Sequence, residues 1–167
     1  MGMHQYLQGL NNLETLNRAP GLFKYQEHSV AAHSFKVAEI AQLLGDIEEE
    51  NGQTINWQVL YERALNHDYT ERFIGRLSEG KDETLEGQLL AVADKIDLLY
   101  ESFGEIEKGN PENAFLEIFA ESLKTIMQYQ NLACARYFIQ EILPDLLSED
   151  FADRGKLTQL VRQTLAE

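Results

Sequence analysis

The chain has 167 residues, of which 44% are hydrophobic, and it carries a formal net charge of −14 at pH 7. This length and apolar content are typical of one globular domain and exclude a largely disordered chain. The acidic balance argues against wrapping a nucleic acid polymer, because such binding depends on Lys and Arg that neutralise phosphates, but it leaves room for a single nucleotide bound at a local cation.

Apolar residues recur at helical spacing through almost the whole chain. The stretches NRAPGLF, ENGQTIN and KGNPEN are turn-like breaks between the periodic segments. No segment shows convincing strand-like alternation. We therefore expect a single all-α domain over residues 1–167, a bundle of about six or seven helices. The predicted helices cover residues 4–16, 30–50, 56–70, 83–108, 112–130, 132–147 and 153–166.

The first residues, MGMHQYLQGL, do not have the basic segment and apolar core of a secretory signal peptide. No apolar run approaches the roughly 18 residues that span a bilayer. Cys134 is the sole cysteine, so an intrachain disulfide is impossible and a reducing compartment fits. We expect a cytoplasmic protein that does not bind a membrane.

Three predicted helices each place a potential metal ligand on their apolar stripe. His33 leads the stripe of the second helix. His67 and Asp68 continue the stripe of the third, and Asp94 shares a face with leucines of the fourth. Buried charge is costly unless it is paired or bound to metal. Two neutral imidazoles and two carboxylates carry a charge of −2, which one divalent cation cancels, and this ligand set suits Mn, Fe, Co, Ni or Zn.

Each of these residues also has a simpler interpretation by itself. His33 alone would more often be a hydrogen-bonded core histidine, and Asp94 alone could pair with a lysine. An adjacent His-Asp pair is common by chance. His28 precedes a serine just as His33 does, but only His33 leads an apolar stripe. The combination on three separate helices favours one divalent metal site.

The order H, HD, D on consecutive helices resembles the signature of the HD-domain metal-dependent phosphohydrolases. The motifs NRAP, SVAAHSFKVAEIA, NHDYTE and ADKID resemble the bacterial YfbR-like 5′-deoxynucleotidases, which remove phosphate from deoxynucleoside monophosphates. The resemblance covers roughly residues 15–105. It implies an HD-domain bundle with His33, His67, Asp68 and Asp94 as the metal ligands.

The same resemblance implies that Arg18 contacts phosphate and that Glu71 orients or activates water. Arg18 precedes a short Pro-Gly turn, and its planar guanidinium can hold phosphate oxygens in two bonds at once. Glu71 follows Asp68 by three residues and His67 by four, hence beside the metal. The alternative interpretations are an ordinary surface arginine for Arg18 and an exposed helix charge for Glu71.

The sequence departs from the family pattern after HDxxE. In the family a further acidic residue follows a glycine, whereas here Arg76 follows Gly75, and only 25 residues separate Asp68 from Asp94. Two interpretations fit. Either the protein is a naturally shortened relative with altered chemistry, or a mobile segment is missing from this sequence between Gly75 and Arg76. We favour the second interpretation, since such a segment would be a natural lid over a nucleotide.

The resemblance implies hydrolysis of nucleoside 5′-monophosphates, with deoxynucleotides favoured. Hydrolysis of an alarmone or a cyclic phosphodiester is an alternative at the same cluster, and so is a catalytically silent metal-containing interaction module. Arg18 and Glu71 argue against the silent module, because a structural metal site needs neither. The resemblance also implies a homodimer, for which the segment 114–147, rich in Phe, Tyr, Ile and Leu, is the expected surface.

Overall fold

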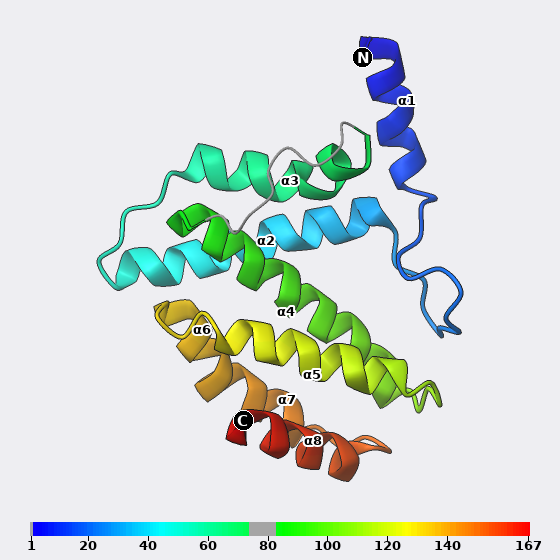
Figure 1. Ribbon diagram of the computed structural model, residues 1–167, viewed down its shortest axis with the longest axis vertical. Coiled ribbons are helices and arrows are strands. Elements are labelled where there is room, and N and C mark those ends of the chain that lie inside the picture. The colour runs from blue at the N-terminus through cyan, green and yellow to red at the C-terminus, as the bar shows by residue number, and fades with distance from the viewer. Residues whose placement is uncertain (1, 74–82) are drawn as a thin grey trace.

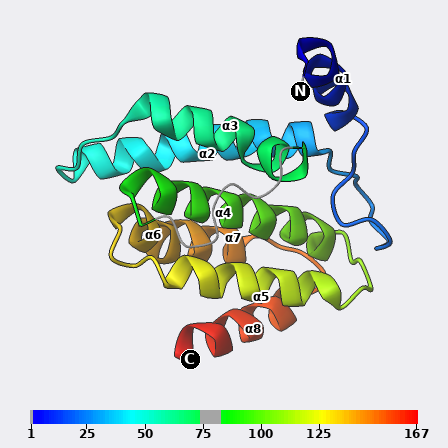
Figure 2. The same ribbon diagram turned by 45° about the horizontal axis from the view of Figure 1, so that its top comes forward.

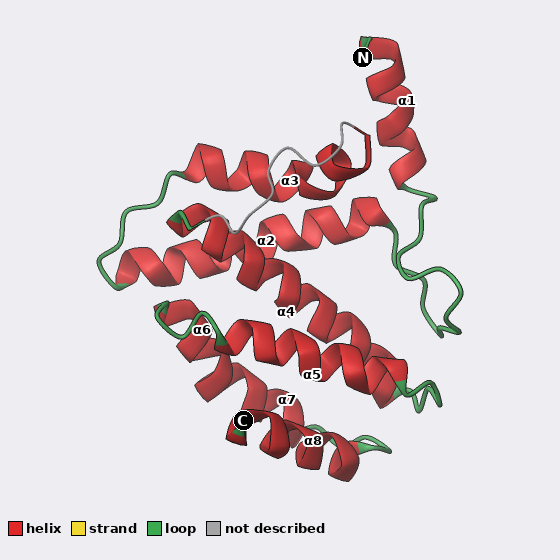
Figure 3. Ribbon diagram, in the orientation of Figure 1, coloured by secondary structure: helices red, strands yellow, loops and turns green. Residues whose placement is uncertain are grey.

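The computed structural model describes residues 2–73 and 83–167, without the side chains of residues 69–73 (Figure 1). All regular secondary structure in this part of the chain is helical (Figure 3), which confirms the all-α prediction. One isolated antiparallel bridge joins Asn17 to Ser29. The elements are α1 Met3–Leu13, α2 Val30–Glu50, α3 Trp57–Phe73, α4 Leu85–Glu107, α5 Ala114–Met127, α6 Ala133–Tyr137, the π-helical turn η1 Phe138–Ile142, α7 Leu143–Ser148 and α8 Arg154–Ala166.

The segment from α6 to α7 is helical without a break, as predicted for residues 132–147, but its middle turn is π-helical rather than α-helical. Pro144 is the second residue after this turn. Proline has no N–H to donate, and in a regular α-helix its ring collides with the carbonyl four residues earlier. The wider π turn before Pro144 relieves this conflict.

Helix α4 lies at the centre of the bundle, because α2 and α3 pack on one side of it and α5 packs on the other. Figures 1 and 2 show α2 and α3 side by side, α5 beyond α4, and α8 on the outer face of α5. Helix α1 projects from the bundle and meets the body near the start of α2. The core between these layers contains the fully buried side chains of Leu60, Leu89, Leu99, Phe119, Leu123 and Ile126.

This arrangement brings the start of α2, the later turns of α3 and the middle of α4 together on one side of the bundle. Those are the three helices on which the sequence places the potential metal ligands. No helix of the described chain is both long and apolar enough to span a bilayer.

Candidate metal centre

The imidazoles of His33 and His67 face each other between α2 and α3, with ring centroids 5.4 Å apart. His33 lies in the first turns of α2, whose N-terminus is capped by the Ser29 hydroxyl accepting from the Ala32 N–H at 3.1 Å. The Nε2 atoms of both histidines are buried and have no hydrogen-bond partner. A buried polar atom without a partner is costly, so the two nitrogens indicate a ligand site.

Two carboxylates complete the cluster. Asp94 Oδ1 lies 3.1 Å from His33 Nε2 and 3.8 Å from His67 Nε2. Asp68 places Oδ2 3.5 Å from His33 Nε2 and Oδ1 3.5 Å from His67 Nε2. Donor atoms that share one cation at about 2.1 Å lie roughly 3.0–3.4 Å apart for angles between 90° and tetrahedral. The structure therefore brings all four predicted ligands together around the two Nε2 atoms, and the ligand atoms of His33, His67 and Asp68 all lie within 4.8 Å of one another.

The second ring nitrogen of each histidine has an acceptor. His33 Nδ1 lies 2.6 Å from Asp97 Oδ2, and His67 Nδ1 lies 2.8 Å from the carbonyl oxygen of Ala64. A carbonyl or carboxylate oxygen requires Nδ1 to carry the proton, which leaves the Nε2 lone pair for a metal. Asp97 was not among the predicted site residues. Its position, three residues after Asp94 on α4, is the signal that it shares the inward face of that helix.

The histidines and carboxylates of the cluster shift one another's pKa values. Burial lowers the pKa of His33, but the carboxylates of Asp94 and Asp97 outweigh it and raise the pKa above its ordinary value. The pKa of His67 is raised in the same way, with Asp94 and Asp68 opposing the effect of burial. Burial raises the pKa of Asp94, yet the contacts with both histidines hold it well below its usual range. The site therefore favours bound positive charge.

Arg18 lies at the rim of the cluster, in the loop between α1 and α2. Its Nη1 donates to Asp68 Oδ2 at 3.4 Å, and its Nε lies 3.4 Å from Glu101 Oε2. Its backbone N–H donates to the His28 carbonyl oxygen at 2.9 Å, which closes the base of the loop. His28 itself lies beside Glu101, with Nδ1 3.8 Å from Oε1, rather than in the metal cluster. Arg18 is thus next to the candidate cation, where a phosphate contact would have to be.

The loop that carries Arg18 is held by hydrogen bonds to α4. Glu105 is 1% exposed, and its carboxylate accepts from the backbone N–H groups of Tyr25 at 2.8 Å and Gln26 at 3.0 Å. Lys24 donates to the carbonyl oxygens of Arg18 and Ala19. These contacts satisfy the backbone of an irregular loop and hold Arg18 in place over the cluster. Glu105 is not among the predicted site residues, because its contacts join residues about 80 positions apart.

Two predictions fall outside the described residues. Position 71 belongs to α3, but the side chain of Glu71 is not described, so its predicted role stays a prediction. The junction of Gly75 and Arg76 also lies outside the described part of the chain.

Comparison with known proteins gives consistent matches. The sequence profile of the family described as 5′-deoxynucleotidase YfbR-like matches residues 5–80 and 75–146. A crystal structure of an HD-domain phosphohydrolase from Listeria innocua is 50% identical, with a TM-score of 0.92, and the match covers all of both chains. No curated protein matches the chain.

Two archaeal structures share the fold. One is a protein from Pyrococcus horikoshii with a TM-score of 0.63, and the other is a conserved hypothetical protein from Pyrococcus furiosus with a TM-score of 0.64. Each is 22% identical, and each match covers 86% of this chain and 98% of the other chain.

Proposed function

Because this chain belongs to the YfbR-like 5′-deoxynucleotidase family of HD-domain phosphohydrolases, we propose that its substrates are deoxynucleoside 5′-monophosphates. The family membership makes the protein a metal-dependent nucleotide phosphohydrolase. The observation that carries the proposal is the pair of buried, unpartnered Nε2 atoms framed by two carboxylates, with an arginine beside them. A cation beside a guanidinium can bind the oxygens of a terminal phosphate monoester.

The proposed ligands of one divalent cation are His33, His67, Asp68 and Asp94. The fit rests on the two orphaned nitrogens and on a ligand charge of −2, which a divalent cation neutralises. Mn, Fe, Co, Ni and Zn all suit two imidazoles and two carboxylates. When bound, such a cation acidifies a coordinated water and polarises a phosphoryl oxygen.

Two further residues, Arg18 and Glu71, are proposed to bind the phosphate and to accept a proton. Arg18 holds phosphoryl oxygens through its planar fork of N–H donors, in competition with its carboxylate partners Asp68 and Glu101. Glu71, which follows Asp68 by about one helical turn, orients the attacking water and accepts its proton. In-line attack of that water on phosphorus breaks the bond to the 5′-oxygen of the sugar. The leaving oxygen takes up a proton, and the products are inorganic phosphate and a nucleoside.

The direct test is phosphate release from a panel of nucleotides by protein stripped of metal with a chelator and reloaded with single divalent metals. Deoxynucleoside 5′-monophosphates should be hydrolysed faster than ribonucleotides, and the stripped protein should be inactive. Faster hydrolysis of a guanosine tetraphosphate alarmone or a cyclic dinucleotide would assign a different substrate to the same centre. No hydrolysis with any metal would contradict the proposal and favour a silent module.

Arg18→Ala should raise the KM for the nucleotide by about 10-fold to 100-fold, since hydrogen bonds to a charged group contribute about 1.5–3 kcal/mol. Metal content should stay unchanged, because Arg18 is not a proposed ligand. Steady-state kinetics and elemental analysis of the same samples measure the two effects. Arg162→Ala, on the exposed side of α8 far from the cluster, is the matched control. An unchanged KM would remove Arg18 from phosphate binding.

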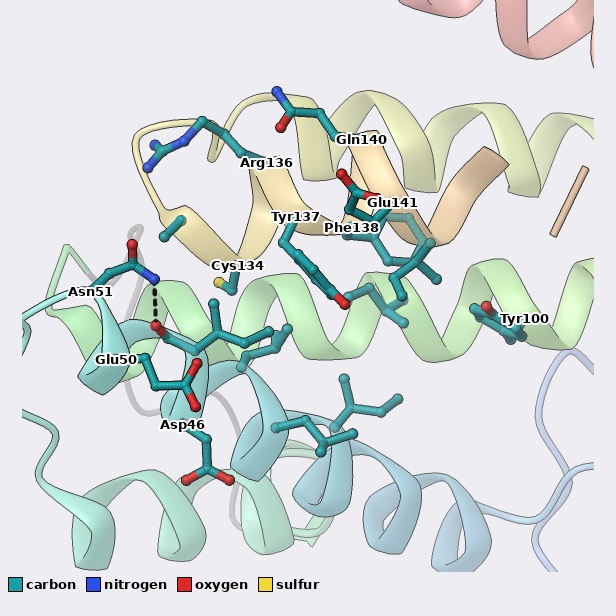
Figure 4. A pocket seen from close by; sticks show the side chains of 17 residues that line it. Asp46, Glu50, Asn51, Tyr100, Cys134, Arg136, Tyr137, Phe138, Gln140 and Glu141 are labelled. Atoms are coloured by element: carbon teal, nitrogen blue, oxygen red, sulfur yellow. Dashed lines mark hydrogen bonds between the residues drawn. The ribbon is translucent and has the colours of Figure 1, made fainter. Parts of the chain in front are cut away.

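We further propose that the protein is a homodimer. Half of the large apolar side chains of segment 114–147 are buried within the chain itself, among them Phe119, Leu123 and Leu143, and nearly all the others are partly buried. The exposed apolar surface includes Tyr137 in α6 together with Leu43 of α2 and Tyr100 of α4. These three side chains line one cavity of about 770 Å³ between the helices, in which Figure 4 shows the two tyrosines. We place the contact between copies there.

The dimer predicts twice the chain mass of 19.1 kDa in solution at micromolar concentration, measurable by light scattering. Tyr137→Glu should shift the protein toward the monomer, because it places a charge in an apolar contact. A monomeric mass for the unaltered protein would contradict the proposal.

A further inference from the structure

Behind the metal centre, a row of charged residues runs from His33 to Arg18. Asp97 Oδ2 contacts His33 Nδ1 at 2.6 Å, and Asp97 Oδ1 accepts from Lys36 Nζ at 2.9 Å. Lys36 Nζ also donates to Glu101 Oε1 at 3.3 Å. The other oxygen of Glu101 lies 3.4 Å from Arg18 Nε. Alternating negative and positive groups thus connect a proposed metal ligand with the proposed phosphate contact.

The row follows from helical spacing. Lys36 lies three residues after His33 on α2, and Asp97 and Glu101 lie four residues apart on α4, so each pair shares one face of its helix. The packing of α2 against α4 brings the two faces together. The side chain of Asp97 is 3% exposed and that of Glu101 is 9% exposed. Buried carboxylates with separate partners for each oxygen are held in one geometry.

From these contacts we propose that Asp97 and Glu101 are positioning residues for the two halves of the site. Asp97 fixes the ring orientation and tautomer of His33, so that the Nε2 lone pair faces the cation. Glu101 fixes the guanidinium of Arg18 for the phosphate, and Lys36 holds both carboxylates. This inference rests on the proposed function, because it assumes a cation at His33 and a phosphate at Arg18.

The first test is Co²⁺ titration of metal-free protein, followed by its visible absorption spectrum. In Asp97→Asn, Lys36 still requires an acceptor, so the introduced amide nitrogen would face His33 Nδ1 and disfavour the tautomer that binds metal. We expect Co²⁺ affinity to fall by about 10-fold to 100-fold, the usual cost of losing such a partner. The absorption bands should also shift, because the orientation of one ligand changes.

The second test separates the two halves. Glu101→Gln should leave the Co²⁺ affinity unchanged but weaken inhibition by inorganic phosphate and raise the KM by about 10-fold. Lys36→Met should weaken both Co²⁺ binding and phosphate binding, because it releases both carboxylates. Glu107→Gln removes one carboxylate from the exposed end of the same helix and is the matched control for all three variants.

The outcomes distinguish this inference from the proposed function. If the unaltered protein bound no Co²⁺ and released no phosphate, the proposed function itself would fail. If the unaltered protein did both, and Asp97→Asn bound Co²⁺ as tightly as Glu107→Gln, the positioning role of Asp97 would be overturned. Should Asp97→Asn not fold, as judged by circular dichroism, Lys36→Met replaces it. Unchanged Co²⁺ affinity and unchanged phosphate inhibition in that variant would then overturn the inference.

Discussion

Asp68→Ala is expected to abolish cation binding and phosphate release together. Asp68 places Oδ2 3.5 Å from His33 Nε2 and Oδ1 3.5 Å from His67 Nε2, so as a proposed ligand it joins the histidines of α2 and α3. Without it, the three remaining proposed ligands carry a charge of −1 and no longer balance a divalent cation. Loss of the several kcal/mol that a metal contributes to the transition state corresponds to at least about a 10³-fold fall in turnover.

Elemental analysis after reconstitution measures the metal, and phosphate release measures turnover in the same samples. Asp68→Asn keeps the volume of the side chain but removes its charge, so a similar loss would show that charge rather than shape is required. Glu39→Ala, at an exposed position of α2 outside the cavity that we assign to the dimer contact, is the control. Full activity in Asp68→Ala would contradict the proposed centre, because Asp94, which also lies near both Nε2 atoms, would then be the single carboxylate left to balance the cation.

The four proposed ligands could be predicted because each one lies on an apolar helical stripe. The helical period fixes which face of its own helix a residue occupies. His33 is fully buried and His67 and Asp94 are partly buried, on the faces by which α2, α3 and α4 meet. The proposed ligand set therefore followed from local patterns together with the family resemblance.

The supporting contacts could not be predicted in the same way. Asp97 and Glu101 pair with residues of α2 and of the preceding loop, 61 to 83 positions away in sequence. Glu105 accepts hydrogen bonds from backbone N–H groups of that loop. Because these donors belong to the backbone, the side chains of Tyr25 and Gln26 do not reveal the contact. Such contacts depend on how α4 packs against α2, which helical periodicity does not specify. The apolar richness of 114–147 was equally ambiguous, because it fits both a core and an interface.

The net negative charge of the chain makes the positive groups at the site, Arg18 and the proposed metal, more important for nucleotide binding. A net charge of −14 repels a nucleotide, which is itself an anion. The candidate site counters this repulsion with Arg18 and with a cluster whose histidines and carboxylates favour bound positive charge. Removing the metal should therefore weaken nucleotide binding as well as stop hydrolysis.

Glu71→Gln is expected to keep the cation and the nucleotide affinity while lowering turnover. Position 71 lies on α3, three residues after Asp68 and four after His67, so it shares the face of that helix that carries both. A carboxylate there can accept a proton from the attacking water, whereas an amide of the same shape cannot. General acid–base groups contribute about 10²–10⁴-fold, and kcat should fall by that factor.

The split between kcat and metal content identifies the role of Glu71. Glu62→Gln, an exposed position of the same helix, is the matched control and should retain full turnover. Metal analysis, nucleotide binding and steady-state kinetics are measured on both variants. Loss of the cation in Glu71→Gln would make Glu71 a ligand rather than a base. Unchanged kcat would remove it from the mechanism, and proton transfer from the water would then have to proceed without that carboxylate.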